Sequence, residues 1–123
     1  MRVWQRADKL VKEICRVTFG FPKFEMYALG DQMRRSSGSV PDNISEGSRK
    51  TTDKDFINYL RHSLGSAGEL ESQIGRAVDA GYVSGEDSDR YLKELDEIVK
   101  MIYGVIRHLM RKKKGKVNKK RKV

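Results

Sequence analysis

Apolar residues recur at steps of three and four along most of the chain, and this spacing constrains the fold more than any other sequence feature. It places these residues along one face of an α-helix, and no competing strand-like alternation is present. The helical pattern is interrupted at Phe19–Lys23, Gly47–Thr52 and Gly81–Ser84, which leaves four segments. Connections this short make successive helices antiparallel, so the sequence predicts an all-α, up-and-down four-helix bundle.

The first segment is regular, whereas the second contains a proline. The apolar face of the first consists of Trp4, Ala7, Leu10, Val11, Ile14, Cys15 and Thr18. The second begins near Lys23–Glu25 and ends at Gly47, and Pro41 within it costs ~3 kcal/mol in a regular helix. We favour a kinked continuous helix over two separate helices, because short polar side chains around the proline can satisfy the freed carbonyls. These side chains are Ser36, Ser37, Ser39 and Asn43.

The third and fourth segments each open with a capping-box pattern, Thr52 with Asp55 and Ser84 with Asp87. The third also contains Gly65-Ser66-Ala67-Gly68 in its interior. Two glycines within a helix cost about 1 kcal/mol each relative to alanine, so the helix either tolerates them or another helix backbone approaches closely there. We favour the close approach.

The charge of the chain is concentrated at its C-terminal end. Nine of the 26 Lys and Arg residues lie in residues 111–123, so the remaining 17 balance the 17 Asp and Glu residues, none of which lies in that stretch. We therefore expect a neutral bundle at residues 1–110 and a basic tail at residues 111–123, which is disordered after Gly115. The predicted nucleic-acid contacts in the tail are Arg111, Lys112, Lys113, Lys114, Lys116, Lys119, Lys120, Arg121 and Lys122.

Several other classes of protein find little support in the sequence. Cys15 is the single cysteine and lies in an apolar helical face, where a small core residue in a reducing compartment is expected. No apolar run approaches the ~20 residues of a membrane span, so a soluble, cytoplasmic protein is predicted. His62 and His108 lack neighbours at metal-ligand spacing, and no nucleophile triad or nucleotide fingerprint is present. We expect neither an enzyme nor a cofactor or metal site.

One stretch of the second segment resembles a known family. The run Leu29-x-x-Gln32-x-Arg34-Arg35-Ser36-x-x-Ser39-Val40-Pro41-x-Asn43-Ile44-x-Glu46-Gly47 is similar to the pattern of proteins encoded by intervening sequences in 23S ribosomal RNA genes, often labelled S23 ribosomal protein. Matching positions elsewhere include Trp4, Ala7, Phe21-Pro22-x-x-Glu25, Phe56, Leu60, Gly65-Ser66-x-x-Glu69-Leu70-Glu71 and Gly81-Tyr82. The resemblance covers about residues 3–110 and omits the tail.

This resemblance implies an antiparallel four-helix bundle that assembles as a homopentamer. It also implies a relationship in fold to the accessory protein of diversity-generating retroelements, a basic pentameric barrel that binds nucleic acid and a reverse transcriptase. The residues expected to support the fold or the oligomer are Trp4, Gln32, Pro41, Asn43, Glu46, Gly47, Gly65, Glu69 and Glu71.

The paired arginines of this run admit two interpretations. Arg34 and Arg35 point about 100° apart on a helix, so at most one faces the core. We favour an ion-pair network within or between subunits, in which Glu46, Glu69 and Glu71 are the candidate partners; the alternative is phosphate binding. Asn43 is expected to satisfy local backbone groups rather than to bind a ligand.

Three functions fit these observations. The favoured one is a non-catalytic, oligomeric nucleic-acid-binding protein in a ribonucleoprotein or retroelement context, whose tail contacts phosphates without reading sequence, although the tail can also serve only solubility. The alternative is an adaptor for the reverse transcriptase of a retroelement. Binding to an acidic lipid surface is the weakest, because only Val117 and Val123 provide apolar anchorage in the tail.

Overall fold

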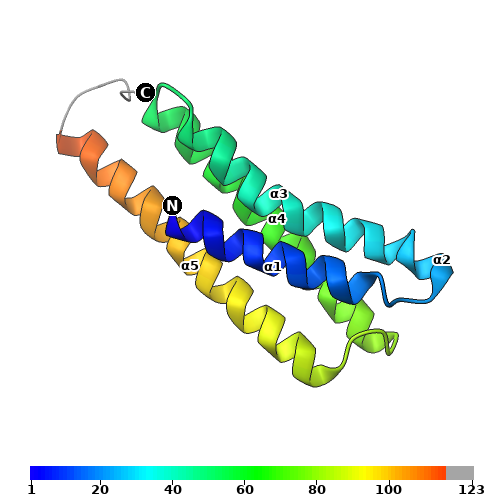
Figure 1. Ribbon diagram of the computed structural model, residues 1–123. Coiled ribbons are helices and arrows are strands. Elements are labelled where there is room, and N and C mark those ends of the chain that lie inside the picture. The colour runs from blue at the N-terminus through cyan, green and yellow to red at the C-terminus, as the bar shows by residue number, and fades with distance from the viewer. Residues whose placement is uncertain (116–123) are drawn as a thin grey trace.

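The computed structural model describes the backbone of residues 1–115 and the side chains of residues 1–112. In this part of the chain, four long helices and one short helix form an antiparallel bundle (Figure 1). The helices are α1 (Arg2–Thr18), α2 (Lys23–Met26), α3 (Leu29–Ser48), α4 (Asp53–Asp79) and α5 (Gly85–Gly115). The predicted all-α four-helix bundle is confirmed. The disorder predicted for the tail concerns residues 116–123, which lie outside the described residues.

The core is a single cluster of apolar side chains, mostly aliphatic, to which all four long helices contribute. Its completely or almost completely buried members include Ile14, Met33, Ile44, Leu60, Leu70, Ile74, Ile98 and Ile102. The prediction that Trp4 belongs to the buried face of α1 is wrong, since Trp4 is 37 % exposed and Val3 is 2 % exposed. At this end of α1 the buried face follows the four-residue step from Ala7 back to Val3, which turns Trp4 toward the edge.

The second predicted helix is divided into two. It was expected to run unbroken from Lys23–Glu25, but α2 ends at Met26 and Ala28 has φ −111° and ψ −92°, outside the helical region. In a continuous helix the Met26 carbonyl would accept from the backbone four residues later. Here it accepts from the Arg34 guanidinium at 2.9 Å, so a tertiary contact replaces the helical one.

Helix α3 continues through Pro41, as expected from the surrounding polar residues. Asn43 donates to the Ser39 carbonyl at 2.8 Å and to the Ser39 hydroxyl at 2.9 Å, so its predicted role as a local backbone partner is confirmed. The hydroxyl of Ser63 on α4 donates to the Val40 carbonyl at 2.7 Å. Polar side chains of both helices therefore surround the proline and tie α3 to α4.

The close approach between helices lies at Gly47 and not at the glycines of α4. A Cβ on Gly47 would stand 2.6 Å from the Cβ of Tyr59 and 2.9 Å from a ring carbon of Phe56. A Cβ on Gly65 or Gly68 would meet nothing within 4 Å. The predicted close approach at these two glycines is therefore wrong within the described chain, because they face open space rather than a neighbouring helix.

The caps of α4 and α5 follow the sequence closely. The Thr52 hydroxyl accepts from the backbone of Asp55 at 3.2 Å, and the Ser84 hydroxyl accepts from that of Asp87 at 3.0 Å. Gly81 has φ +80°, a left-handed conformation that glycine adopts without strain, and it ends α4. Both capping predictions are confirmed.

Candidate nucleic-acid interface

The C-terminal end of α3, the start of α4 and the C-terminal end of α5 lie at one end of the bundle (Figure 1). Six cations with described side chains belong to these segments and to the turn that joins α3 to α4. Because α4 and α5 are antiparallel and joined by a short loop, the first turn of α4 lies level with residues about 110–112 of α5. We call this surface the basic end, and define it by Arg49, Lys50, Lys54, Arg107, Arg111 and Lys112.

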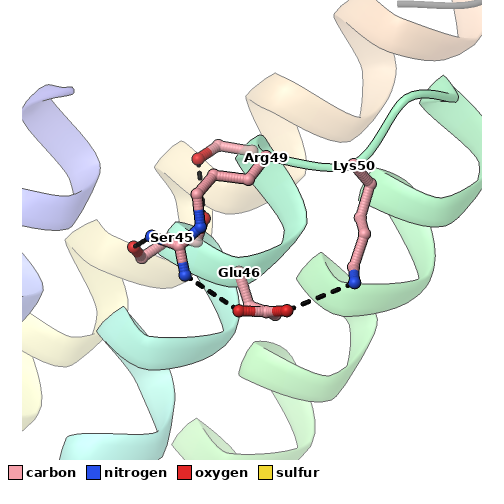
Figure 2. A network of polar contacts seen from close by, with 5 residues as sticks. Ser45, Glu46, Arg49 and Lys50 are labelled. Atoms are coloured by element: carbon pink, nitrogen blue, oxygen red, sulfur yellow. Dashed lines mark hydrogen bonds and ion pairs between the residues drawn. The ribbon is translucent and has the colours of Figure 1, made fainter. Parts of the chain in front are cut away.

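The turn between α3 and α4 is fixed by a network around Glu46 (Figure 2). The Glu46 carboxylate accepts from Arg49 Nη2 at 2.8 Å and lies 3.2 Å from Lys50 Nζ. These two contacts, the Arg49 hydrogen bond first, lower the pKa of Glu46. Lys50 also lies over the Tyr59 ring at 5.1 Å. One carboxylate thus orients two cations. With Lys54 against Asp53 and Asp55 in the first turn of α4, the turn has no net formal charge.

The cations on α5 have no such partner. Arg107, Arg111 and Lys112 are exposed, and no carboxylate of residues 1–115 pairs with them. They follow a helix whose first turn holds Glu86 and Asp87, so the charge of α5 changes sign from its N-terminus to its C-terminus. Positive side chains at a helix C-terminus are stabilised by the helix dipole, which favours this distribution.

The structure describes only part of the predicted tail. Arg111 and Lys112 extend α5 as exposed side chains. The backbone of Lys113 and Lys114 continues the same helix, but their side chains lie outside the described set. The remaining predicted contacts, Lys116, Lys119, Lys120, Arg121 and Lys122, also lie outside the described residues.

Arg34 does not belong to the basic end, and its partners differ from those expected. Its guanidinium donates to the Thr18 hydroxyl at 3.0 Å and to the Met26 carbonyl at 2.9 Å, and it lies 4.5 Å from the centre of the Phe19 ring. The C-terminal end of α1 and helix α2, which provide these partners, lie at the opposite end of the bundle (Figure 1). The expected partners Glu46, Glu69 and Glu71 are therefore wrong for Arg34 within the described chain, because its position near the start of α3 brings it against α1 and α2.

Arg35 and the two acidic residues of α4 are exposed. Arg35 forms an ion pair with Asp31 one turn earlier at 3.0 Å, and its side chain is 81 % exposed. Within the part of the chain that the structure describes, it therefore pairs with none of the expected acidic partners, and pairing between subunits stays a prediction. Glu69 and Glu71 face solvent and belong to no ion pair among residues 1–115. Gln32 is exposed as well.

A shallow polar groove of about 360 Å³ lies between α3 and α4. It is lined by Ser39, Asn43, Arg61, His62, Gly65, Ser66 and Glu69. Ser66 donates to the Ser39 hydroxyl at 2.8 Å across the two helices, so the floor of the groove is a hydrogen-bonded contact between them. Gly65 contributes to this groove by its missing side chain.

Sequence reasoning missed Arg49, Lys50 and Lys54 as members of a basic surface. None of the three stands out in residues 1–110, where positive and negative residues are equal in number. Only their position beside the end of α5 gives them a shared role. The available signal was topological, since an antiparallel bundle puts the connection between the second and third segments at the same end as the C-terminus of the fourth.

The described side chains and helices offer neither a metal site nor a membrane span. No group of three or more His, Cys, Asp and Glu residues within the described part of the chain is arranged to hold a metal ion. None of the helices within residues 1–115 combines the length and the apolar character that crossing a membrane requires.

The sequence profile of the 23S rRNA-intervening sequence protein family matches residues 1–104. The chain belongs to this family. The family match covers α1 to α4 and most of α5, and it ends before Arg107, the first α5 cation of the basic end. The family description is related to RNA and names no enzyme class.

A solved structure supports the same fold. The crystal structure of a protein of unknown function from the S23 ribosomal protein family of Bacteroides thetaiotaomicron superposes with a TM-score of 0.78 at 24 % sequence identity. The alignment covers 85 % of this chain and 97 % of that one. At this identity the likeness establishes the fold alone. A search of curated proteins finds no match.

Proposed function

We propose that this family member is a non-catalytic cytoplasmic protein that binds the phosphate backbone of nucleic acid through its basic end and tail. RNA is the first candidate for this nucleic acid. The observation that carries the proposal is the exposed cationic end of α5, where Arg111 and Lys112 have no acidic partner among residues 1–115 and lie level with the turn between α3 and α4. The RNA-related family supports the choice of partner.

The proposed contact is with phosphates and not with bases. Lysine and arginine at a helix end have no fixed geometry toward base edges, so they neutralise phosphates and release counterions. If the basic end and the tail together neutralise six to nine phosphates, the affinity falls about a thousandfold or more between 50 and 200 mM salt. Little discrimination between sequences is expected.

A triple variant in the full chain tests this proposal. Arg107→Gln, Arg111→Gln and Lys112→Gln together remove three charges from the basic end. The matched control, Arg61→Gln with Arg76→Gln and Lys93→Gln, removes three exposed charges elsewhere. Fluorescence anisotropy with a labelled RNA, repeated across a salt titration, measures the binding.

We expect the basic-end variant to bind more weakly and to reduce the salt slope by about two to three, since each phosphate contact contributes about 0.7–0.9 to that slope. The control variant should keep the wild-type slope. Equal slopes for the wild type and the basic-end variant would remove the basis of the proposal.

We also propose that the protein acts as a homo-oligomer, a pentamer by family resemblance. Multi-angle light scattering of the full chain measures the mass directly, and a monomer at micromolar concentration would exclude it. The adaptor role toward a reverse transcriptase stays a prediction; a reverse transcriptase gene and a variable repeat beside the coding sequence would support it, and a position inside a ribosomal RNA gene would oppose it.

A further inference from the structure

The end of the bundle opposite the basic end displays three aromatic side chains to solvent. Phe19 is 61 % exposed, Phe24 72 % and Tyr27 70 %. Large aromatic rings are normally buried, because each removes 150–250 Å² from water, so three exposed rings within nine residues require an explanation. We call these three residues the aromatic tip.

The segment that carries the aromatic tip is anchored to the core. Phe21 is 6 % exposed and its ring centre lies 5.3 Å from that of Tyr82, while Met26 packs against the core cluster. Phe24 and Tyr27 are three residues apart, which places them on the same side of the α2 turn. Because Phe21 and Met26 fix the segment, the exposed rings are held outward and do not result from a loose loop.

Arg34 joins the two halves of the tip. Its guanidinium contacts the Phe19 ring at the end of α1 and the Met26 carbonyl beside Tyr27, so one side chain holds α1 and α2 together. Its hydrogen-bond partners, a hydroxyl and a carbonyl, are neutral. No carboxylate of residues 1–115 pairs with Arg34, so its positive charge remains uncompensated beneath the Phe19 ring.

Further cations border the aromatic tip. Arg16 and Lys23 are exposed and have no acidic partner in the described chain. Acidic residues lie at this end of the bundle too. Asp31 pairs with Arg35, Glu25 is half-buried, and Asp79, Glu86 and Asp89 are exposed where α4 ends and α5 begins. Exposed rings beside cations without an acidic partner in the described chain fit a partner that offers flat π-systems joined by negative charges.

We propose that the aromatic tip is a stacking site for the bases of a single-stranded nucleic acid. Base–aromatic stacking contributes about 1–3 kcal/mol per base, requires unpaired bases and tolerates any sequence, while neighbouring cations contact the phosphates. This inference rests on the proposed function for the class of partner, but it uses different residues at the other end. A duplex cannot use this site, since its bases are already stacked.

The basic end and the aromatic tip would then bind different features of one nucleic acid. Helix α3 has 20 residues, which corresponds to about 30 Å at 1.5 Å per residue, so the aromatic tip and the basic end are separated by roughly that length. An RNA in which a paired segment adjoins a single-stranded one can contact both.

The test compares the wild type with a full-chain double variant that carries both Phe24→Ala and Tyr27→Ala. The control is Tyr103→Ala, which removes an exposed ring on α5 that is 47 % exposed. The probes are a labelled 12-nucleotide single-stranded RNA and the duplex of the same sequence, measured by anisotropy at 50 and 200 mM salt. The variant Phe24→Tyr with Tyr27→Phe keeps both rings.

We expect the alanine variant to lose about ten- to a hundredfold in affinity for the single strand, by a factor that hardly changes with salt, and to bind the duplex as the wild type does. The ring-keeping variant and the Tyr103 control should bind both probes normally. No loss, or an equal loss on both probes, overturns the inference, as does a changed solution mass of the alanine variant, which would make the tip a subunit contact.

The basic-end variant, measured in parallel, separates the two proposals. It should weaken binding of both probes. If it binds normally while the alanine variant loses single-strand binding, the proposed function of the basic end fails and the aromatic tip stands; the reverse result leaves the basic end and removes the tip.

Discussion

Two pairs of neighbouring helices, α3 with α4 and α1 with α5, are held together by different kinds of interaction. The α3–α4 interface is closed and partly polar: Gly47 lets the backbones approach, and the buried Ser63 hydroxyl bonds the Val40 carbonyl. The α1–α5 interface carries charges at its edge, where Arg6 forms two hydrogen bonds with Glu94 and Arg90 pairs with Glu13. These residues line an open groove of about 490 Å³.

The difference shows where this fold requires a particular residue and where it tolerates change. A backbone contact made through a missing side chain has no room for adjustment, because the neighbouring atoms are fixed by packing. Ion pairs at the edge of a groove are solvated and adjustable, so each contributes little to stability. Substitutions at the α3–α4 interface should therefore cost more than substitutions at the α1–α5 interface.

The largest effect is expected for Gly47→Ala. The new Cβ would stand 2.6 Å from the Cβ of Tyr59, closer than real contacts allow, so α3 and α4 must move apart. We expect the free energy of unfolding to fall by about 1–3 kcal/mol, as is usual for overpacking. Urea unfolding followed by circular dichroism measures it, and an unchanged midpoint would show that this interface is not tightly closed.

A smaller effect of opposite sign is expected for Gly65→Ala, the matched control for Gly47. Its Cβ meets nothing within 4 Å, and alanine is the better helix former. The free energy of unfolding should rise by about 0.5–1 kcal/mol. Destabilisation or a lower solution mass would show instead that a second copy of the chain approaches this surface, which would restore the predicted contact as an intersubunit one.

The smallest effect is expected for Glu94→Gln at the α1–α5 interface. The hydrogen bond from Arg6 lowers the pKa of Glu94, so the ionised form is favoured in the folded state. The resulting stability is present above the usual pKa of glutamate and is lost as the pH falls through the lowered pKa. Thermal unfolding should show that Glu94→Gln is slightly less stable than the wild type at pH 7, and this difference should disappear in acid.

Asp96→Asn is the control for this pH dependence. Asp96 pairs with Lys100 within α5, at 3.0 Å and largely exposed, so it joins no two helices. If Asp96→Asn lowers the thermal stability at pH 7 as much as Glu94→Gln does, the interhelical pair has no special role in joining α1 to α5.

The periodic apolar residues determined most of the fold without reference to the structure. Steps of three and four residues, Gly81 and the capping pairs at Thr52 and Ser84 are local features, and local features act through the backbone of a few neighbouring residues. The continuous helix through Pro41 was also predictable, because the polar side chains that accommodate the proline lie close to it in sequence.

The candidate sites depended on the tertiary structure. Arg49 and Lys54 join the end of α5 through topology, and Phe24 and Tyr27 become exposed because Phe21 and Met26 take the buried positions. Sequence patterns predicted Arg111 and Lys112 as cationic but gave Arg34 the wrong partners.

Residue types and their spacing alone establish that this chain forms four amphipathic segments, with a neutral body and a basic C-terminal tail, since both properties are sums over residues. The tertiary structure decided which glycine permits contact, which side chain holds the Arg34 guanidinium and which rings remain in solvent. These depend on distances between residues far apart along the chain, and the relative rotation and translation of the packed helices sets those distances.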